Sequence, residues 1–199
     1  MTNTVLTRAV MKQQTVREIV LFLVLVGVAV VSRLIEYFPP NAHAVAAAAL
    51  LAGLLFRSRV VALCVPLLAM MISDSVIGGH DGLVMVTVYG SLVLPVLRCG
   101  ALRRDRLLTP IAAVAGSMVF YLTTNFAHWL SFGDRMQEAQ WTWSGLVHCY
   151  AIALPFFKYT LMGDLGYSAV LFGAYAVAKL LTAPANHTPG EAAAAPILA

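Results

Sequence analysis

The sequence predicts an all-α membrane protein, a helical bundle of about six transmembrane helices, and three observations lead to this fold class. The chain of 199 residues is 60% hydrophobic and only 11% charged, with a mean hydropathy of +0.83. Soluble domains carry about 25% charged residues. The charges cluster between long apolar runs, and each membrane crossing needs about 20 apolar residues. Basic residues flank these runs, so the net charge of +4 is interpreted as a topology signal rather than as a nucleic-acid surface.

The apolar runs divide the chain into three regions. Residues 1–17 are polar and are expected to form a cytoplasmic N-terminal segment, and residues 18–182 form the membrane domain. Residues 183–199 are rich in Ala and Pro and are expected to be a disordered tail. The first run follows basic residues as a signal sequence does but continues past Arg33, which favours an uncleaved helix. The six expected spans are 18–38, 43–57, 60–78, 83–102, 107–131 and 158–182.

A short apolar stretch precedes the last expected span. Residues 132–144 form a polar loop with tryptophans, which suits a membrane interface. Residues 145–157 are apolar but too short to cross. The sequence therefore predicts one short re-entrant or interfacial helix that ends at Pro155, because proline interrupts helical hydrogen bonding.

The basic residues indicate the orientation of the bundle. With six spans and a cytoplasmic N-terminus, three basic residues lie outside: Arg33, Arg135 and Lys158. The other ten lie inside, as the positive-inside rule requires: Arg8, Lys12, Arg17, Arg57, Arg59, Arg98, Arg103, Arg104, Arg106 and Lys179. Both termini are therefore expected in the cytoplasm, and most unusual polar residues fall in the outer half.

Two of these polar motifs lie at the end of the third span. Asp74 is a carboxylate at the edge of an apolar helix, where carboxylates are costly and rarely face lipid. It either contacts a ligand, pairs with Lys158, or meets water at the interface. His80 lies in the turn "GGHDG", where it is either a ligand contact or a solvated loop residue.

The stretch "TTNFAHW" places several hydrogen-bonding side chains on one helix face. Thr124 and His128 are four residues apart, as are Asn125 and Trp129. This face either binds a ligand or bonds neighbouring helices together. Lys158 and Asp164 are six residues apart, so each is expected to meet a different partner. Lys158 could equally extend to lipid headgroups.

Small residues recur every four positions in the second expected span, at Ala44, Ala48 and Ala52. Such spacing allows helices to approach closely, either within the bundle or against another membrane subunit. The sequence lacks a Walker motif and paired zinc-binding cysteines. Weak protease-like patterns around Asp74, Asp164 and Ser144 lack their usual flanking residues, so an enzyme is not expected.

Four segments together resemble a family of small uncharacterised membrane proteins that is grouped with transporters. They are "RLIEYFPPNAHAVAAAALLAG", "RSRVVALCVPLLAMMISDSVIGGHDG", "TNFAHWLS" and "YAIALPFFKYTLMGDLGYSAVLFGA". This family is similar to the substrate-binding S components of energy-coupling factor (ECF) vitamin transporters. The resemblance covers about residues 18–178 and implies a six-helix bundle with a vitamin or metal site near the outer face. It also implies a coupling subunit and ATPases as partners.

Within that group the chain most resembles solitary S components for cobalamin uptake, in which an outer cysteine ligates cobalt. No cysteine occupies "GGHDG" here, so the resemblance implies His80 as the cobalt ligand, with His148 and Cys149 as alternatives. Docking on the coupling subunit is commonly made by an alanine motif of the first helix. Here the alanines lie in the second expected span.

The sequence therefore predicts a multi-pass protein of the bacterial inner membrane that binds and takes up a small vitamin or cofactor, with cobalamin as one candidate substrate. No resident cofactor is required. The alternatives are an assembly protein without a ligand and, less favoured, a membrane enzyme. Tyr89, Trp129 and Tyr159 are expected to pack against a ligand ring. The expected substrate-binding residues are Asp74, His80, Tyr89, Asn125, His128, Trp129, Lys158 and Asp164.

Overall fold

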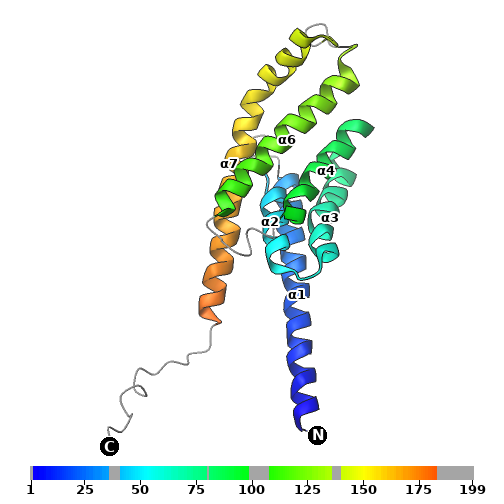
Figure 1. Ribbon diagram of the computed structural model, residues 1–199. Helices are drawn as coiled ribbons and strands as arrows, with labels where there is room; N and C mark the ends of the chain where they lie inside the picture. Colours follow the sequence, from blue (N-terminus) through cyan, green and yellow to red (C-terminus); the bar gives the residue numbers. More distant parts are fainter. Residues whose placement is uncertain (1, 36–40, 80, 99–107, 136–139, 183–199) are drawn as a thin grey trace, which may run out of the picture.

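The computed structural model describes residues 2–35, 41–79, 81–98, 108–135 and 140–182. These residues form helices and contain no strand, which confirms the all-α prediction for the described chain. The helices are α1 (Thr2–Leu34), α2 (Val45–Leu55), α3 (Arg59–Ile77), α4 (Gly82–Arg98), α6 (Thr109–Phe132) and α7 (Trp143–Leu181). Figure 1 shows a bundle in which α1 begins and α7 ends at the same end of the molecule. The turn between α6 and α7 lies at the opposite end.

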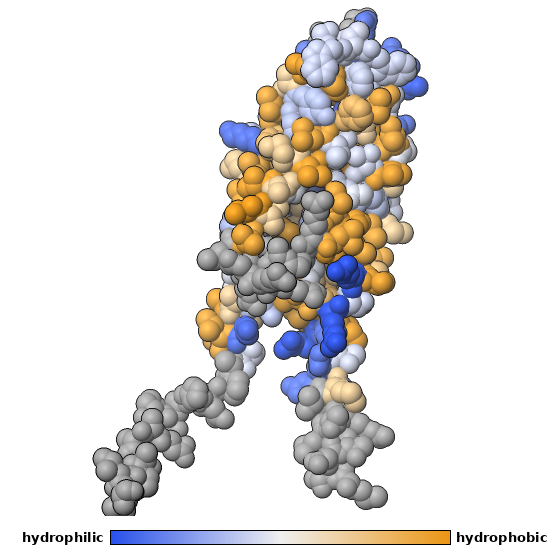
Figure 2. Space-filling view, viewed as in Figure 1, coloured by the Kyte–Doolittle hydropathy of each residue, from blue (hydrophilic) through white to orange (hydrophobic). Residues whose placement is uncertain are grey.

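Four helices are long and apolar enough to cross a membrane: α1 from Met11, α3, α6 and α7. Helices α2 and α4 are apolar but shorter. Large hydrophobic side chains such as Leu23, Val86 and Val170 are exposed on the outside of the bundle, where lipid would cover them. On the face in Figure 2 the hydrophobic residues cover the middle of the molecule, and hydrophilic residues gather at its ends. These features indicate an integral membrane protein.

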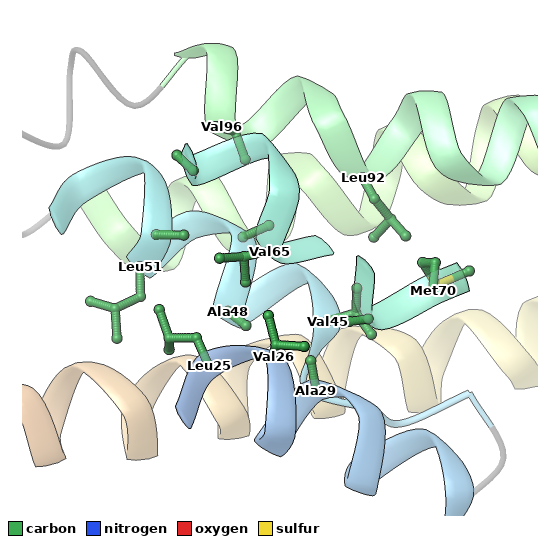
Figure 3. Packing of buried hydrophobic residues seen from close by; sticks show 14 of the residues in the cluster. Leu25, Val26, Ala29, Val45, Ala48, Leu51, Val65, Met70, Leu92 and Val96 are labelled. Carbon is green, nitrogen blue, oxygen red and sulfur yellow. The ribbon is translucent and has the colours of Figure 1, made fainter. Parts of the chain in front are cut away.

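Helix α2 lies at the centre of the bundle and contacts each of the other five described helices. Its residues are small, and Ala47, Ala48, Ala49 and Ala52 are completely buried. A helix that is apolar all round is expected to be buried in this way. Ala48 and Val45 pack between Val26 of α1 and Val65 of α3 (Figure 3). The alanine spacing therefore serves packing inside the chain, and this face is not available to dock another subunit.

Helix α7 runs without interruption through Pro155, so the prediction of a separate re-entrant helix at 145–157 is wrong. Thr142 caps its N-terminus by accepting a hydrogen bond from the backbone N–H of Gly145. The proline removes one backbone hydrogen bond, which transmembrane helices tolerate, and Pro66 and Pro95 are likewise inside helices. The predicted short helix at 145–157 therefore lies within the first part of a 39-residue helix.

The other predicted boundaries are close to the observed ones, with one exception. Helix α1 begins at Thr2, so the segment predicted as a polar N-terminal region is helical and continuous with the first span. Three sets of residues for which predictions were made lie outside the described residues: 36–38, 99–102 and 107 of the predicted spans, 136–139 of the predicted polar loop, and the tail 183–199.

Candidate functional site: a cavity at one end of the bundle

The α6–α7 hairpin and α4 enclose a cavity of about 610 Å³. It lies towards the α6–α7 turn, away from the ends where α1 begins and α7 finishes. Half of the described lining residues are apolar or aromatic: Val84, Val88, Phe120, Phe132, Ile152, Ala153, Phe156 and Phe157. The remaining lining residues carry polar atoms: Asn41, Asp81, Tyr121, Thr124, Asn125, His128, Cys149 and Thr160. A cavity of about 300–1,000 Å³ with this mixture is typical of small-molecule sites.

The polar face predicted on the fifth expected span forms one wall of this cavity. Thr124, Asn125 and His128 all line it. The Thr124 hydroxyl donates to the carbonyl of Phe120, and the Asn125 amide donates to the carbonyl of Tyr121. These hydrogen bonds stay within α6, and neither side chain has a hydrogen bond to another helix among the described residues. The ring of His128 packs 4.9 Å from the ring of Phe132 on the same helix.

Two tyrosines join α6 to α7 beside this wall. The Tyr121 hydroxyl donates to the carbonyl of Tyr150 at 2.6 Å, and the Tyr150 hydroxyl donates to the carbonyl of Leu122 at 2.7 Å. Their rings lie 5.6 Å apart, and Tyr121 also packs on Phe157 at 4.7 Å. This reciprocal pair of hydrogen bonds therefore helps to join α6 to α7 beside the cavity.

Two residues from turns complete the lining. Asp81 precedes α4, and the backbone N–H of Leu83 donates to its carboxylate. Asn41 has a left-handed backbone with φ of 65°, which asparagine tolerates better than most residues. Its neighbour Ala42 lies against α7 at Gly163, where an added Cβ would come within 2.8 Å of the Ala42 Cα. The absence of a side chain at Gly163 therefore allows the 41–44 turn to approach the cavity.

A buried polar cluster lies outside the cavity. Asp74 of α3 forms an ion pair of 2.8 Å with Arg33 of α1, with side chains only 9% and 7% exposed. The other carboxylate oxygen of Asp74 accepts a hydrogen bond from the Tyr89 hydroxyl at 2.9 Å, and Arg33 also donates to Ser73. The predicted pairing of Asp74 with Lys158 is therefore wrong, because Arg33 neutralises Asp74.

His43 interacts electrostatically with this cluster from the turn before α2. Desolvation by burial, together with the positive charge of Arg33, lowers the pKa of His43 from 6.5 to about 4. His43 is therefore neutral at physiological pH.

Asp164 lies in α7 and does not line the cavity. Its side chain is buried, and one of its oxygens is 2.6 Å from the Ser117 hydroxyl of α6. Thr160, one helical turn nearer the α6–α7 turn, does line the cavity. Asp164 is therefore one turn below the cavity.

The remaining predicted site residues lie elsewhere. The Trp129 indole donates to the carbonyl of Gln140, which ties it to the turn after α6. Lys158 is exposed, with its ammonium 5.9 Å from the ring centre of Tyr159. Tyr89, Tyr159 and His148 do not line the cavity. His80 lies outside the described residues.

Sequence reasoning missed the α7 wall and the role of Arg33. The α7 residues Cys149, Ile152, Phe156 and Thr160 recur every three or four positions, which marks one helix face. This spacing predicts one continuous face only when residues 143–181 are treated as a single helix. Arg33 was a single cation inside an apolar run, and such residues generally pair within the bundle.

Among the described residues, no group of three or more His, Cys, Asp or Glu side chains could hold a metal ion. The cavity wall nevertheless contains single groups that could ligate a metal already carried by a substrate. These are His128 and Cys149, and the Cys149 thiol contacts the carbonyl of Asn125 at 3.7 Å.

The fold and the site define an all-helical membrane protein with a ligand-sized cavity at one end of its bundle. The chain belongs to the family of unknown function DUF6580, whose model matches residues 12–186. Comparison with curated proteins and with solved structures gave no match.

Proposed function

We propose that this protein binds a small vitamin or cofactor in the cavity and mediates its uptake across the bacterial inner membrane. The observation that carries the proposal is the cavity itself, with about 610 Å³ between aromatic walls and a few polar groups from four parts of the chain. Polar side chains that served only to join helices would bond across the helix interface. Thr124 and Asn125 instead bond within α6 and present their side chains to the cavity.

The lining indicates what kind of molecule fits. Aromatic rings favour a planar heterocycle, and the amide, hydroxyl and imidazole groups offer hydrogen bonds that fix its orientation. Lysine and arginine are absent from the described lining, and Asp81 is its one carboxylate. This composition favours a neutral or cationic ligand over an anionic one. A corrinoid such as cobalamin is larger than the cavity and would enter only in part, so smaller cofactors are the first to test.

The orientation follows from the basic residues. With the ends of α1 and α7 in the cytoplasm, the cavity faces outwards, where an uptake protein must meet its substrate. An ECF-type coupling subunit with its ATPases remains a candidate partner. The alanine-rich face of α2 would not serve as its docking surface, because that face is buried.

The test is ligand-dependent thermal stabilisation of the purified protein in detergent, using a panel of vitamins and cofactors that includes cobalamin. A true ligand raises the unfolding temperature of the wild type, because it binds only the folded state. The variants Asn125→Ala and His128→Ala should lose most of that increase. The control Lys158→Ala removes an exposed cation outside the cavity and should keep it.

Absorbance spectra and mass spectrometry of the purified protein would detect a ligand that remains bound. If the panel gives neither a co-purified compound nor stabilisation, the binding function is rejected. In that case, loss of stability in Asn125→Ala without any ligand would favour an assembly protein.

A further inference from the structure

Two buried carboxylates in this bundle have opposite surroundings. Asp74 is neutralised by Arg33 at 2.8 Å. Asp164 is only 5% exposed, and neither ion pair found among the described residues includes it. An ionised carboxylate inside a membrane bundle is costly unless it is paired, so an unpaired one either carries a proton or holds a cation.

The contacts of Ser117 are consistent with the protonated state. The Ser117 hydroxyl is 3.0 Å from the carbonyl of Ala113 and 2.6 Å from the Asp164 carboxyl. A serine hydroxyl has one hydrogen, which can point at one acceptor. If it points at Ala113, the short contact with Asp164 requires a hydrogen from the Asp164 carboxyl. A protonated Asp164 that donates to Ser117 therefore satisfies both contacts.

Among the described residues, the surroundings contain little else that could neutralise a charge. The helices packed against α7 at this level are α6 and α2. Helix α2 has no titratable residue, and those of α6 are Tyr121 and His128, which lie nearer its turn with α7. The 41–44 turn contributes His43, which interacts with Arg33 and Asp74. On α7 itself, the nearest cation is Lys158, which is exposed.

A second buried polar group marks the same face of α7. Ser168 is 4% exposed, and its hydroxyl has no hydrogen-bond partner among the described residues. Thr160, Asp164 and Ser168 are spaced by four residues, so they lie one above another on the helix. Thr160 lines the cavity, and this polar line therefore continues from the cavity floor into the bundle.

We infer that Asp164 is a proton-binding site of this protein. It exchanges protons along the line of Thr160, Asp164 and Ser168 below the cavity. In the described conformation the carboxyl is neutral, which permits close packing of α6 on α7. On release, the carboxyl O–H bond breaks, its electron pair stays on the oxygen, and the proton passes to water. The resulting carboxylate would be unfavourable in the buried contact between α6 and α7. Proton release is therefore linked to separation of these two helices. This inference does not depend on which ligand the cavity takes.

The experiment is infrared spectroscopy of the purified protein at neutral and alkaline pH. A protonated carboxyl absorbs at a higher frequency than an ionised one. The wild type should show this band at neutral pH and lose it at alkaline pH while remaining folded. Asp164→Asn should abolish the band, and the matched control Asp74→Asn should keep it, because the ion-paired Asp74 is not its source.

The variant Ser117→Ala provides a second test, which applies even if Asp164→Asn does not fold. It removes the acceptor of the Asp164 hydrogen, so the band should move to higher frequency. A wild type without the band at neutral pH would overturn the inference. So would a band that persists in Asp164→Asn or stays unmoved in Ser117→Ala.

Discussion

At the residue scale, the Arg33–Asp74 pair shows how the bundle accommodates charge. The guanidinium is held by Asp74 and Ser73, and Tyr89 satisfies the second carboxylate oxygen. Breaking a buried pair leaves the remaining charge without a partner, and this costs more than the pair itself contributes.

Asp74→Ala should therefore lower the free energy of unfolding by about 3–5 kcal/mol. The double variant Arg33→Met/Asp74→Leu should recover much of that loss, since no charge is left buried. Denaturant or thermal unfolding in detergent measures both. The control is Asp134→Ala, which breaks an exposed 3.9 Å pair with Arg135 and should cost well under 1 kcal/mol. Equal losses at the two sites would refute the role of burial.

His43 gives the protein a pH-dependent stability. Its pKa falls from 6.5 to about 4 on folding, so below pH 6.5 the unfolded chain binds a proton that the folded chain does not. Above pH 6.5 the neutral His43 makes its full contribution to the free energy of unfolding. As the pH falls towards 4 the free energy of unfolding decreases, by up to about 3 kcal/mol. The unfolding temperature of wild type should fall across this window. His43→Gln should fall less, and an identical decline would show that His43 is not the cause.

Single residues also mark the limit of what sequence could predict about the site. Asn125 and His128 were predicted from spacing on one helix, and both line the cavity. Asp74 and Asp164 were predicted because membrane carboxylates are costly, but that cost does not specify the partner. Asp74 meets Arg33 because α1 packs on α3, and this packing depends on tertiary contacts that a local pattern does not contain.

At the element scale, the contact of α7 with the 41–44 turn depends on one glycine. Gly163→Ala would place a Cβ against the Ala42 backbone, which cannot rotate away as a side chain could. The expected cost is about 1–3 kcal/mol of unfolding free energy. Gly166→Ala is the matched control, because a Cβ there meets nothing within 4 Å. It should be neutral or stabilising by about 0.5–1 kcal/mol. Comparable destabilisation by both variants would exclude the proposed contact.

The helices themselves were largely predictable, and the exception has a physical reason. Apolar runs bounded by polar residues gave α2, α3, α4 and α6 within a few residues. The first part of α7 was assigned to a separate helix because Pro155 usually interrupts helices in water. Within a bundle, packing against α6 and the Tyr121–Tyr150 hydrogen bonds hold the helix together across that proline.

At the scale of the whole molecule, the orientation in the membrane can be tested directly. Cysteine introduced at Asp134, in the α6–α7 turn, should react in intact cells with a maleimide that cannot cross the inner membrane. Cysteine introduced at Arg57, between α2 and α3, is exposed at the other end and should react only after the membrane is permeabilised. The wild type, with its native cysteines, measures the background. The reverse pattern would place the cavity on the cytoplasmic side.

The continuity of α7 has a mechanical consequence. An α-helix rises about 1.5 Å per residue, so its 39 residues extend about 58 Å, well beyond the roughly 30 Å hydrocarbon core of a bilayer. The same helix forms the cavity wall from Cys149 to Thr160 and extends to the opposite end of the bundle, where Lys179 lies in its last turn. Helix α2 packs against α7. A small tilt of α7 about this contact, as it adjusts to a bound ligand, would displace the opposite end of the helix. If the proposed ligand binds in the cavity, we therefore expect α7 to move at both ends of the molecule.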